Sequence, residues 1–227
     1  MCLILAGTFS ACKKDKDRNP GGKTNCRIVE VKVPGSQDVL ITYNSDGKVS
    51  KEVEEDSVVD AYTYKEDSIF IVQTVAGRFG SRQVIAVNPH GLATYVRSEY
   101  DPQGDLWNAF QFEYNGDQIS RSTYTASDGG VTITTYTWLD GNLVASTVNG
   151  FTYTYGYYTD KPSQDGDYFS FSQLLSGVET VRNKNLLKSL SGNEVTYSFD
   201  GSGKISSLHM SANSSQITTA NYTYQCD

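Results

Sequence analysis

The sequence predicts an all-β protein, an antiparallel meander of about fifteen strands that forms a soluble barrel or a strongly curved sheet. Three observations lead to this prediction. Turn-forming sequences, many of them Asn-Gly or Asp-Gly, recur roughly every 10 to 15 residues. The runs between the turns are rich in Val, Ile, Thr and Tyr, and 16 of the 227 residues are Tyr. Apolar residues make up only 38% of the chain, which suits strands with one buried and one wet face.

The first residues resemble the end of an export signal. Residues 1–11 combine a short apolar run with small residues, as in a secretory signal peptide, and the run is shorter than the roughly 20 residues that span a bilayer as a helix. No basic residues precede the run, so we expect this signal peptide to be truncated at its N-terminus. Phe9-Ser10-Ala11-Cys12 resembles the lipobox of bacterial lipoprotein precursors, with Phe9 in place of the usual Leu. The resemblance implies that Cys12 is the lipid-attachment site.

A lipidated Cys12 anchors the protein to a membrane. An N-acyl and a diacylglyceryl group on this residue give a very stable attachment, because each buried CH₂ group contributes about 0.8 kcal/mol. Residues 12–25 also contain a charged run and a Pro-Gly-Gly stretch, which indicate a flexible tether. Residues 26–227 then form a single β domain. We expect an outer-membrane protein, and the mixed charges after Cys12 leave open whether it lies in the periplasmic or the cell-surface leaflet.

Two of the four cysteines are predicted to form a disulfide in the mature chain. Cys26 follows the tether and Cys226 is one residue from the C-terminus, and export places both in an oxidising compartment. Such a bridge sets the first and last strands side by side, as in a sheet that closes on itself. Two free thiols or a metal site are the alternatives. The metal site lacks partners, because the chain has only His90 and His209 and no CxxC motif, and we expect no cofactor.

Strands and turns alternate along the β domain. Asn-Gly and Asp-Gly allow the positive φ angles of type I′ hairpins, as at Asn115–Gly116, Asp140–Gly141 and Asn149–Gly150. The clearest strands are Val39–Tyr43, Ser68–Val75, Phe110–Tyr114, Val131–Leu139, Phe151–Tyr157 and Val195–Phe199. One interval, Thr159–Asn185, alternates only weakly. We expect a longer loop there, with a short helix around Phe171–Leu175.

A loose hairpin unit repeats along the domain: an aromatic residue, Asp or Asn, Gly, an aliphatic residue and Ser. It appears as Tyr43–Ser50, Tyr114–Ser120, Trp138–Ser146 and Phe199–Ser206. With the lipobox, Lys184–Leu187 and the terminal Tyr222–Cys226, this unit resembles a family of secreted lipoproteins of Gram-negative bacteria, domain of unknown function 4595. The unit is also similar to the YD repeats of large bacterial surface proteins. The resemblance covers about residues 26–226, implies a porin-like β-barrel or strongly curved sheet, and brings no catalytic residues.

Charge and strand patterning argue against two functions, nucleic-acid binding and membrane spanning. The net charge is −7 and no block of Lys and Arg is present, so the chain lacks the electrostatic footprint of a nucleic-acid-binding protein. The strands of a membrane-spanning barrel need an apolar outer side across roughly 9–11 residues. Here the strands are short and many alternate positions hold Thr, Ser, Gln or a charged residue, which favours a barrel surrounded by water.

The most suggestive candidate site is aromatic. In Phe151–Tyr157 aromatic residues alternate with Thr and Gly, so their rings share one face of a strand. An exposed row of this kind stacks on sugar rings, which makes Tyr153, Tyr155 and Tyr157 candidate ligand-binding residues. The alternative is that the rings fill the sheet core. The same spacing recurs at Tyr62/Tyr64 and Tyr222/Tyr224.

Other residues do not commit the chain to a reaction. Carboxylates cluster at Glu54–Asp56 and Asp165–Asp167. Glycoside hydrolysis needs two carboxylates that face each other across a cleft, and the ligand spacing of an EF-hand is missing. Asp56-Ser57-Val58 and Asp67-Ser68-Ile69 match the short Asp-Ser-aliphatic pattern at which some Gram-negative bacteria O-glycosylate exported proteins.

We therefore expect a binding or scaffolding lipoprotein at the outer membrane and not an enzyme. Its expected partners are the membrane, through the lipid anchor, and a glycan, peptide or protein ligand. A hydrolase acting on polysaccharide or cell-wall material is the alternative, supported only by the scattered carboxylates. A lipid-carrying barrel would need a hollow apolar interior, which the modest aliphatic content barely supplies.

Overall fold

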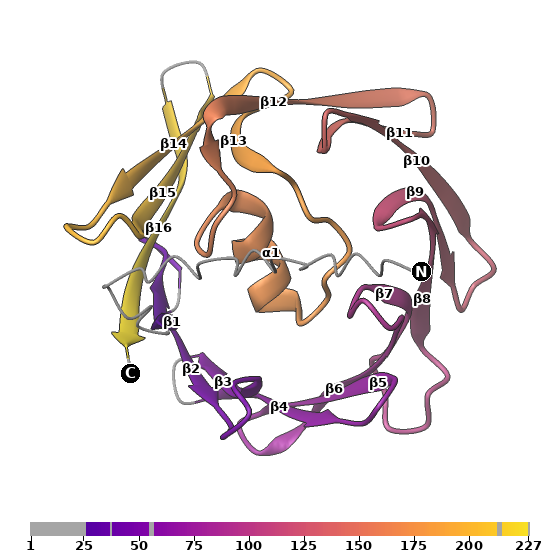
Figure 1. Cartoon of the computed structure of the whole chain (residues 1–227). Coiled ribbons are helices and arrows are strands. Elements are labelled where there is room, and N and C mark those ends of the chain that lie inside the picture. Colours follow the sequence, from indigo (N-terminus) through magenta and orange to yellow (C-terminus); the bar gives the residue numbers. More distant parts are fainter. Residues whose placement is uncertain (1–25, 37, 55–56, 213–214, 227) are drawn as a thin grey trace, which may run out of the picture.

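Consecutive strands of the chain pair with one another around a closed barrel (Figure 1). The computed structural model describes residues 26–36, 38–54, 57–212 and 215–226, which contain sixteen strands and one helix. All the strand pairs are antiparallel, and β1 (Cys26–Lys32) pairs with β16 (Ser215–Cys226) to close the ring. The predicted all-β antiparallel meander is confirmed, with sixteen strands in place of about fifteen. Of the two predicted forms, the barrel is the one observed.

The strands are five to twelve residues long and most connections between them are short. After β1 they are β2 (Val39–Tyr43), β3 (Val49–Glu54), β4 (Val58–Tyr64), β5 (Ser68–Val75), β6 (Arg78–Val87), β7 (Ala93–Glu99) and β8 (Trp107–Asn115). The second half contains β9 (Gln118–Ala126), β10 (Val131–Leu139), β11 (Asn142–Val148), β12 (Phe151–Pro162), β13 (Asn185–Leu190), β14 (Asn193–Phe199) and β15 (Ile205–Ala212).

Tight turns join the strands where the sequence predicts them. Asp140 and Gly141 have φ angles of 51° and 84°, and Asn149 and Gly150 have φ angles of 50° and 80°. Two successive positive φ angles are the mark of a type I′ turn, whose twist matches that of the flanking strands. The two turns therefore join β10, β11 and β12 as consecutive hairpins.

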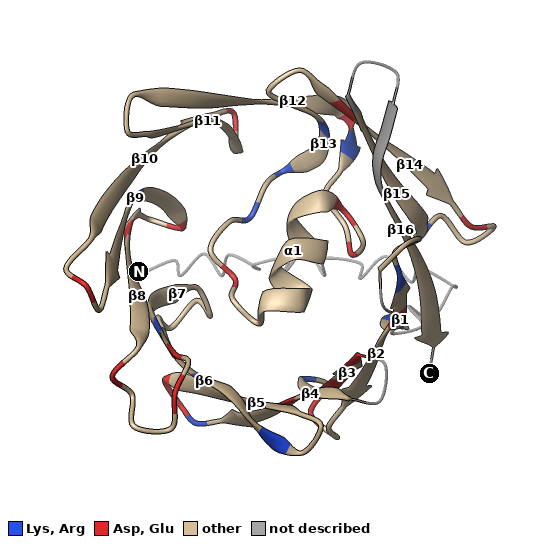
Figure 2. Cartoon of the chain, turned by 180° about the vertical axis from the view of Figure 1, so that it is seen from behind, with Lys and Arg blue, Asp and Glu red and all other residues tan. Residues whose placement is uncertain are grey.

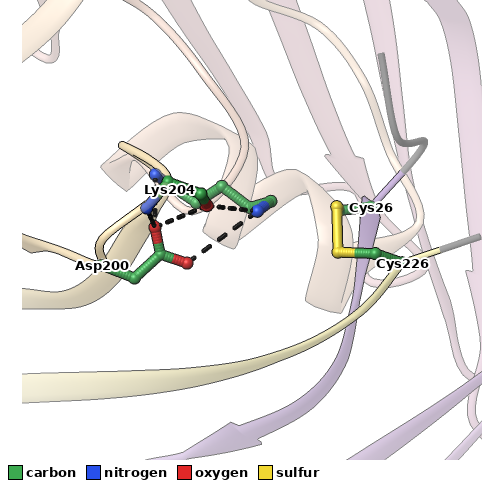
Figure 3. The surroundings of a disulfide bond; sticks show 5 residues. Cys26, Asp200, Lys204 and Cys226 are labelled. Atoms are coloured by element: carbon green, nitrogen blue, oxygen red, sulfur yellow. Dashed lines mark hydrogen bonds and ion pairs between the residues drawn. A yellow bond between two sulfur atoms is a disulfide. The ribbon is translucent and has the colours of Figure 1, made fainter. Parts of the chain in front are cut away.

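The barrel closes where its first and last strands meet. Cys26 lies directly opposite Cys226 in the β1–β16 pair, and the two sulfurs are bonded at 2.07 Å (Figure 3). The bridge joins positions 200 residues apart in the sequence. The strand arrangement is the one that the positions of these cysteines predict.

The long connection between β12 and β13 enters the barrel. It contains helix α1 (Tyr168–Ser176), which lies inside the ring of strands (Figure 1). The Asp167 carboxylate caps the start of the helix by accepting a hydrogen bond from the Ser170 N–H at 2.8 Å. Gly177 ends the helix in the left-handed conformation, with φ 65°. The predicted helix around Phe171–Leu175 is confirmed, and it begins at Tyr168. We call residues 163–184 the plug.

The plug supplies the core that the wall cannot make alone, because sixteen strands enclose more space than wall side chains fill. Different parts of the plug pack against different arcs of the wall. Phe171 packs on the cluster that includes the fully buried Leu186. Val178 packs on the cluster that includes Ile85, and Val181 is itself buried among residues of β8 to β12.

Backbone hydrogen bonds fix the plug at one end of the barrel. The Ala93 N–H donates to the Glu179 carbonyl at 2.8 Å, and the Lys184 N–H donates to the Gly141 carbonyl at 3.0 Å. Ala93 is the first residue of β7, directly after the β6–β7 turn, and Gly141 belongs to the β10–β11 turn. Both turns lie at the same end as Cys26, and we call this the plugged end. Successive hairpins alternate between the two ends, so the β5–β6, β7–β8 and β11–β12 turns lie at the other end, which we call the open end.

Candidate functional site in the barrel lumen

The inner face of the wall becomes polar toward the open end. Alternate residues of each strand face the lumen, and the strand register shows which of them lie at one level. Two runs of direct cross-strand partners are polar, and we call them the polar belt. They are Glu52, Asp60 and Gln73 on β3 to β5, and Gln83, Ser98 and Asn108 on β6 to β8. Hydrogen-bonding groups on an inner wall can pair with water or with a polar ligand.

The members of each run contact one another. The Gln73 amide donates to Asp60 Oδ2 at 3.5 Å, and the Gln83 amide donates to Ser98 Oγ at 3.0 Å. At the end of the second run, the Asn108 amide donates to a tyrosine hydroxyl, that of Tyr100, at 2.8 Å. The belt is therefore an ordered surface and not a set of independent side chains.

A cavity of about 530 Å³ lies between this wall and the plug. We call it the aromatic pocket because six aromatic side chains line it: Tyr100, Phe110, Phe112, Tyr136, Tyr155 and Phe169. The rest of its lining consists of aliphatic side chains and uncharged amides and hydroxyls, among them Ser172 and Gln173 of α1. Among the described residues no charged side chain lines it. Ligand sites of proteins have this size and this mixture of apolar walls and a few polar groups.

Polar contacts hold the rings of the aromatic pocket in place. The Tyr136 hydroxyl lies 2.9 Å from Ser122 Oγ, and burial raises the pKa of this phenol, with the Ser122 hydrogen bond opposing part of the rise. Tyr136 is thus neutral at physiological pH and offers a hydroxyl without a charge. Tyr100 is 47% exposed, so a ligand entering from the open end reaches it first.

A second cavity, of about 160 Å³, lies at the open end beside the first run of the belt. Glu52, Glu54 and Asp60 line it together with apolar side chains, and we call it the acidic pocket. Glu52 and Asp60 are direct cross-strand partners. Burial raises the pKa of Glu52 to about 7, and a hydrogen bond from Tyr62 offsets part of this effect. Burial also raises the pKa of Asp60.

The three predicted ligand-binding tyrosines lie at different depths. Tyr153 is 47% exposed at the open end. Tyr155 lines the aromatic pocket, and its ring centre is 5.8 Å from that of Phe169. Tyr157 packs in the core and donates a hydrogen bond to the Leu143 carbonyl at 2.7 Å. The rings do not form one exposed row, and of the three it is Tyr155 that lines the aromatic pocket.

Some predicted features lie outside the described residues. They include the lipid-attachment site Cys12, with the signal peptide and the tether, and residues 55–56, which belong to an acidic cluster and to one glycosylation pattern. In the described part of the chain, no group of three or more His, Cys, Asp and Glu side chains is arranged to hold a metal ion. Within the same residues no helix is long and apolar enough to cross a membrane.

The remaining candidates occupy structural positions. Asp167 caps α1 as described above. His90 Nδ1 lies 2.8 Å from Asp117 Oδ1 in an exposed pair between two turns. His209 lies on β15, where its Nε2 is 2.9 Å from Ser207 Oγ. None of the three contacts the aromatic pocket.

Sequence reasoning missed the polar belt and both pockets. The available signal was a change from apolar to polar residues along the inward-facing positions of a strand. On β5, for example, Gln73 follows the buried Ile71 on the same face. Recognising it requires the register of each strand with its neighbours.

Comparisons with known proteins find the fold among solved structures. No family model and no curated protein matches this sequence. The crystal structure of a porin-like protein from Bacteroides uniformis matches with a TM-score of 0.61 and 17% identity, covering 87% of this chain and 98% of that one. A porin-like protein from Bacteroides vulgatus matches with the same TM-score and coverage and 18% identity. The chain therefore shares the barrel fold of these porin-like proteins.

Proposed function

We propose that the protein binds a neutral, hydroxyl-rich ligand, an oligosaccharide, in the aromatic pocket. The observation that carries this proposal is the lining of the pocket, where aromatic rings stand beside uncharged amides and hydroxyls without a charged group among the described residues. Rings stack on the apolar faces of sugars, and amides and hydroxyls exchange hydrogen bonds with sugar hydroxyls. Tyr100 and Asn108, paired at the mouth, offer both kinds of contact in one place.

The outer wall supports a binding role over passage through a membrane. Charged pairs cross neighbouring strands on its outer face, as Arg82 with Glu99 and Arg121 with Glu113, the latter at 3.6 Å. Charged residues also occur on other strands and turns around the ring (Figure 2). Charges at such positions are costly against lipid. The plug in turn occupies the lumen through which a solute would pass.

A hydrolase remains less well supported. Glu52 and Asp60 are neighbours on one wall, whereas glycoside hydrolysis uses carboxyl groups on opposite sides of a bound sugar. Binding without bond cleavage fits the geometry better.

The location and family of the protein are part of the proposal. The lipobox-like Phe9–Cys12 supports a lipid anchor on Cys12 and an outer-membrane location. The hairpin unit and the terminal Tyr222–Cys226 support membership of the domain of unknown function 4595 and kinship with YD repeats. Metabolic labelling with palmitate in the host bacterium tests the anchor, since Cys12→Ser should abolish the label and release the protein from the membrane fraction.

A glycan array followed by calorimetry tests the binding site. We expect at least one oligosaccharide class to bind, and Tyr100→Ala to weaken it at least tenfold, about 1.4 kcal/mol. Tyr95→Ala is the matched control, because Tyr95 lies on the outer face of the same region and is 38% exposed. The Tyr153→Ala/Tyr155→Ala double variant should also lose affinity. Absence of binding on the array, or equal effects of Tyr100→Ala and Tyr95→Ala, would contradict the proposal.

A further inference from the structure

The acidic pocket differs from the aromatic pocket in chemistry and position. The two cavities lie on either side of the last turn of α1, where Leu175 lines the acidic pocket and Ser176 lines the aromatic one. The acidic pocket is lined by three carboxylates, while charged groups are missing from the described lining of the other. A ligand suited to one is therefore unsuited to the other.

Glu52 is the least solvated carboxylate of the acidic pocket. Its side chain projects from the β3 wall, and only 4% of the residue is exposed. Its Oε1 is buried and has no hydrogen-bond partner among the described residues. A buried carboxylate oxygen without a partner is costly, and such groups are normally paired with a cation or a donor. Glu52 Oε1 thus lacks a hydrogen-bond donor, and a ligand can supply one.

The neighbours of Glu52 add negative charge and no positive charge. Asp60 faces it from β4, and Glu54 lies two residues along β3. Tyr62, also on β4, is neutral because burial raises its pKa. The rest of the pocket is lined by valines of β1, β2, β4 and the β1–β2 connection, by Ser36 of that connection and by Leu175 of α1, and among the described lining residues there is neither Lys nor Arg. The pocket therefore attracts a cation.

The walls select the kind of cation. Apart from the carboxylates and Ser36, the pocket is lined by Val31, Val33, Val39, Val58 and Leu175. Apolar walls suit an aliphatic stem and give a hydrated metal ion few of the six to eight oxygen ligands that calcium takes. A primary ammonium group donates three hydrogen bonds from a compact charge at the end of such a stem. A volume of about 160 Å³ has room for roughly five water molecules, or for a short alkyl chain.

We propose that the acidic pocket binds a primary alkylammonium group, as carried by a lysine side chain or a polyamine, with the ammonium on Glu52 and Asp60 and the alkyl chain against the valines. This gives the lumen a second binding function that is separate from the aromatic pocket. Binding keeps Glu52 ionised, so the ligand competes with a proton for this carboxylate.

Titration of the protein with pentylammonium, followed by two-dimensional NMR at pH 8, tests the site. We expect saturable shifts of amides on β3 and β4, and at least tenfold weaker binding of 1-pentanol, which has the same chain without the charge. Glu52→Gln and Asp60→Asn should each weaken pentylammonium at least tenfold, whereas Glu113→Gln, on the outer wall, should leave it unchanged. Below pH 7 the affinity should fall about tenfold per pH unit as Glu52 takes up its proton.

The outcome is separable from that of the oligosaccharide proposal. Tyr100→Ala, which alters only the aromatic pocket, should bind pentylammonium as the unaltered protein does. Equal binding of 1-pentanol and pentylammonium, or undiminished binding by both the Glu52→Gln and Asp60→Asn variants, would overturn the inference. Saturation of the same amides by calcium at lower concentration than by pentylammonium would also overturn it, by identifying a metal site.

Discussion

The contact between the plug and the wall at Gly177 gives a quantitative prediction. Gly177 ends α1 with φ 65°, and a Cβ at this position would lie 2.6 Å from Ile71 Cδ1 and 2.9 Å from Tyr62 Cε1. Gly177→Ala therefore introduces both a left-handed alanine and an overlap with two side chains of the wall. Left-handed backbone costs an L-residue roughly 1–2 kcal/mol, and overpacking of a core typically costs about 1–3 kcal/mol more.

A second glycine separates these two contributions. Gly77, in the β5–β6 turn, has φ 74°, and a Cβ at this position would meet no heavy atom within 4 Å. Gly77→Ala should therefore carry only the backbone cost, whereas Gly177→Ala should carry both, about 2–5 kcal/mol in total. Both substitutions restrict the unfolded chain to the same extent, so this effect cancels in the comparison.

Urea unfolding of the two variants, followed by circular dichroism, measures the difference. We expect Gly177→Ala to lose about 1–3 kcal/mol more free energy of unfolding than Gly77→Ala. Amide hydrogen exchange should also be faster across residues 168–184 in Gly177→Ala, because the plug packs less well against the wall in this variant. Equal losses in the two variants would refute the close packing of the plug against β4 and β5.

Three further predictions concern stability. Replacing Cys26 and Cys226 by Ser removes a cross-link between positions 200 residues apart and should lower the free energy of unfolding by up to about 5 kcal/mol. A loss below about 1 kcal/mol in urea would contradict a stabilising role for the disulfide between β1 and β16. Tyr157→Phe removes the hydrogen bond to the Leu143 carbonyl and should lower the free energy of unfolding by about 1 kcal/mol. An unchanged melting temperature would contradict a stabilising role for this hydrogen bond. The pKa of Glu52 is about 7 in the folded state against 4.5 ordinarily, so the unfolded state loses this proton at lower pH. The free energy of unfolding should therefore fall as the pH rises from about 4.5 to 7, and Glu52→Gln should reduce this pH dependence. A free energy of unfolding that rises over this range would contradict the burial of Glu52.

The architecture was predictable because its signals are local. Asp140–Gly141 and Asn149–Gly150 specify hairpin turns through their own backbone preferences, and the structure has the expected positive φ angles there. The helix was also locally encoded, by the Asp167 cap and Gly177. The position of the helix in the lumen was not locally encoded. It depends on the width of the barrel, which follows from closure of the whole sheet and not from any one strand.

The site was less predictable because the position of a side chain along the barrel axis, and how deeply it is buried, depend on several strands together. Alternation placed the rings of Phe151–Tyr157 on one face, and in the structure two of them, Tyr155 and Tyr157, pack inside the barrel. It did not reveal that the strand runs from the exposed mouth into the core. The β12–β13 register shifts between Gly156 and Tyr157, and such irregularities cannot be read from one strand alone.

The polar belt shows the same limit. Gln83, Ser98 and Asn108 are ordinary polar residues in their own strands. They form a surface only because β6, β7 and β8 pair in a particular register. Acidic composition and scattered carboxylates gave no sign that Glu52 and Asp60 meet inside the barrel.

Blocking the mouth of the lumen tests the central claim most directly. Tyr100→Cys places a thiol at the mouth of the aromatic pocket, and Tyr95→Cys places one on the outer face, while Cys26 and Cys226 are bonded to each other. After labelling with a bulky maleimide, the Tyr100→Cys protein should bind the oligosaccharide selected on the array at least tenfold more weakly than the same protein before labelling, whereas labelling should leave binding by the Tyr95→Cys protein unchanged. Undiminished binding by the labelled Tyr100→Cys protein would contradict a ligand site in the lumen.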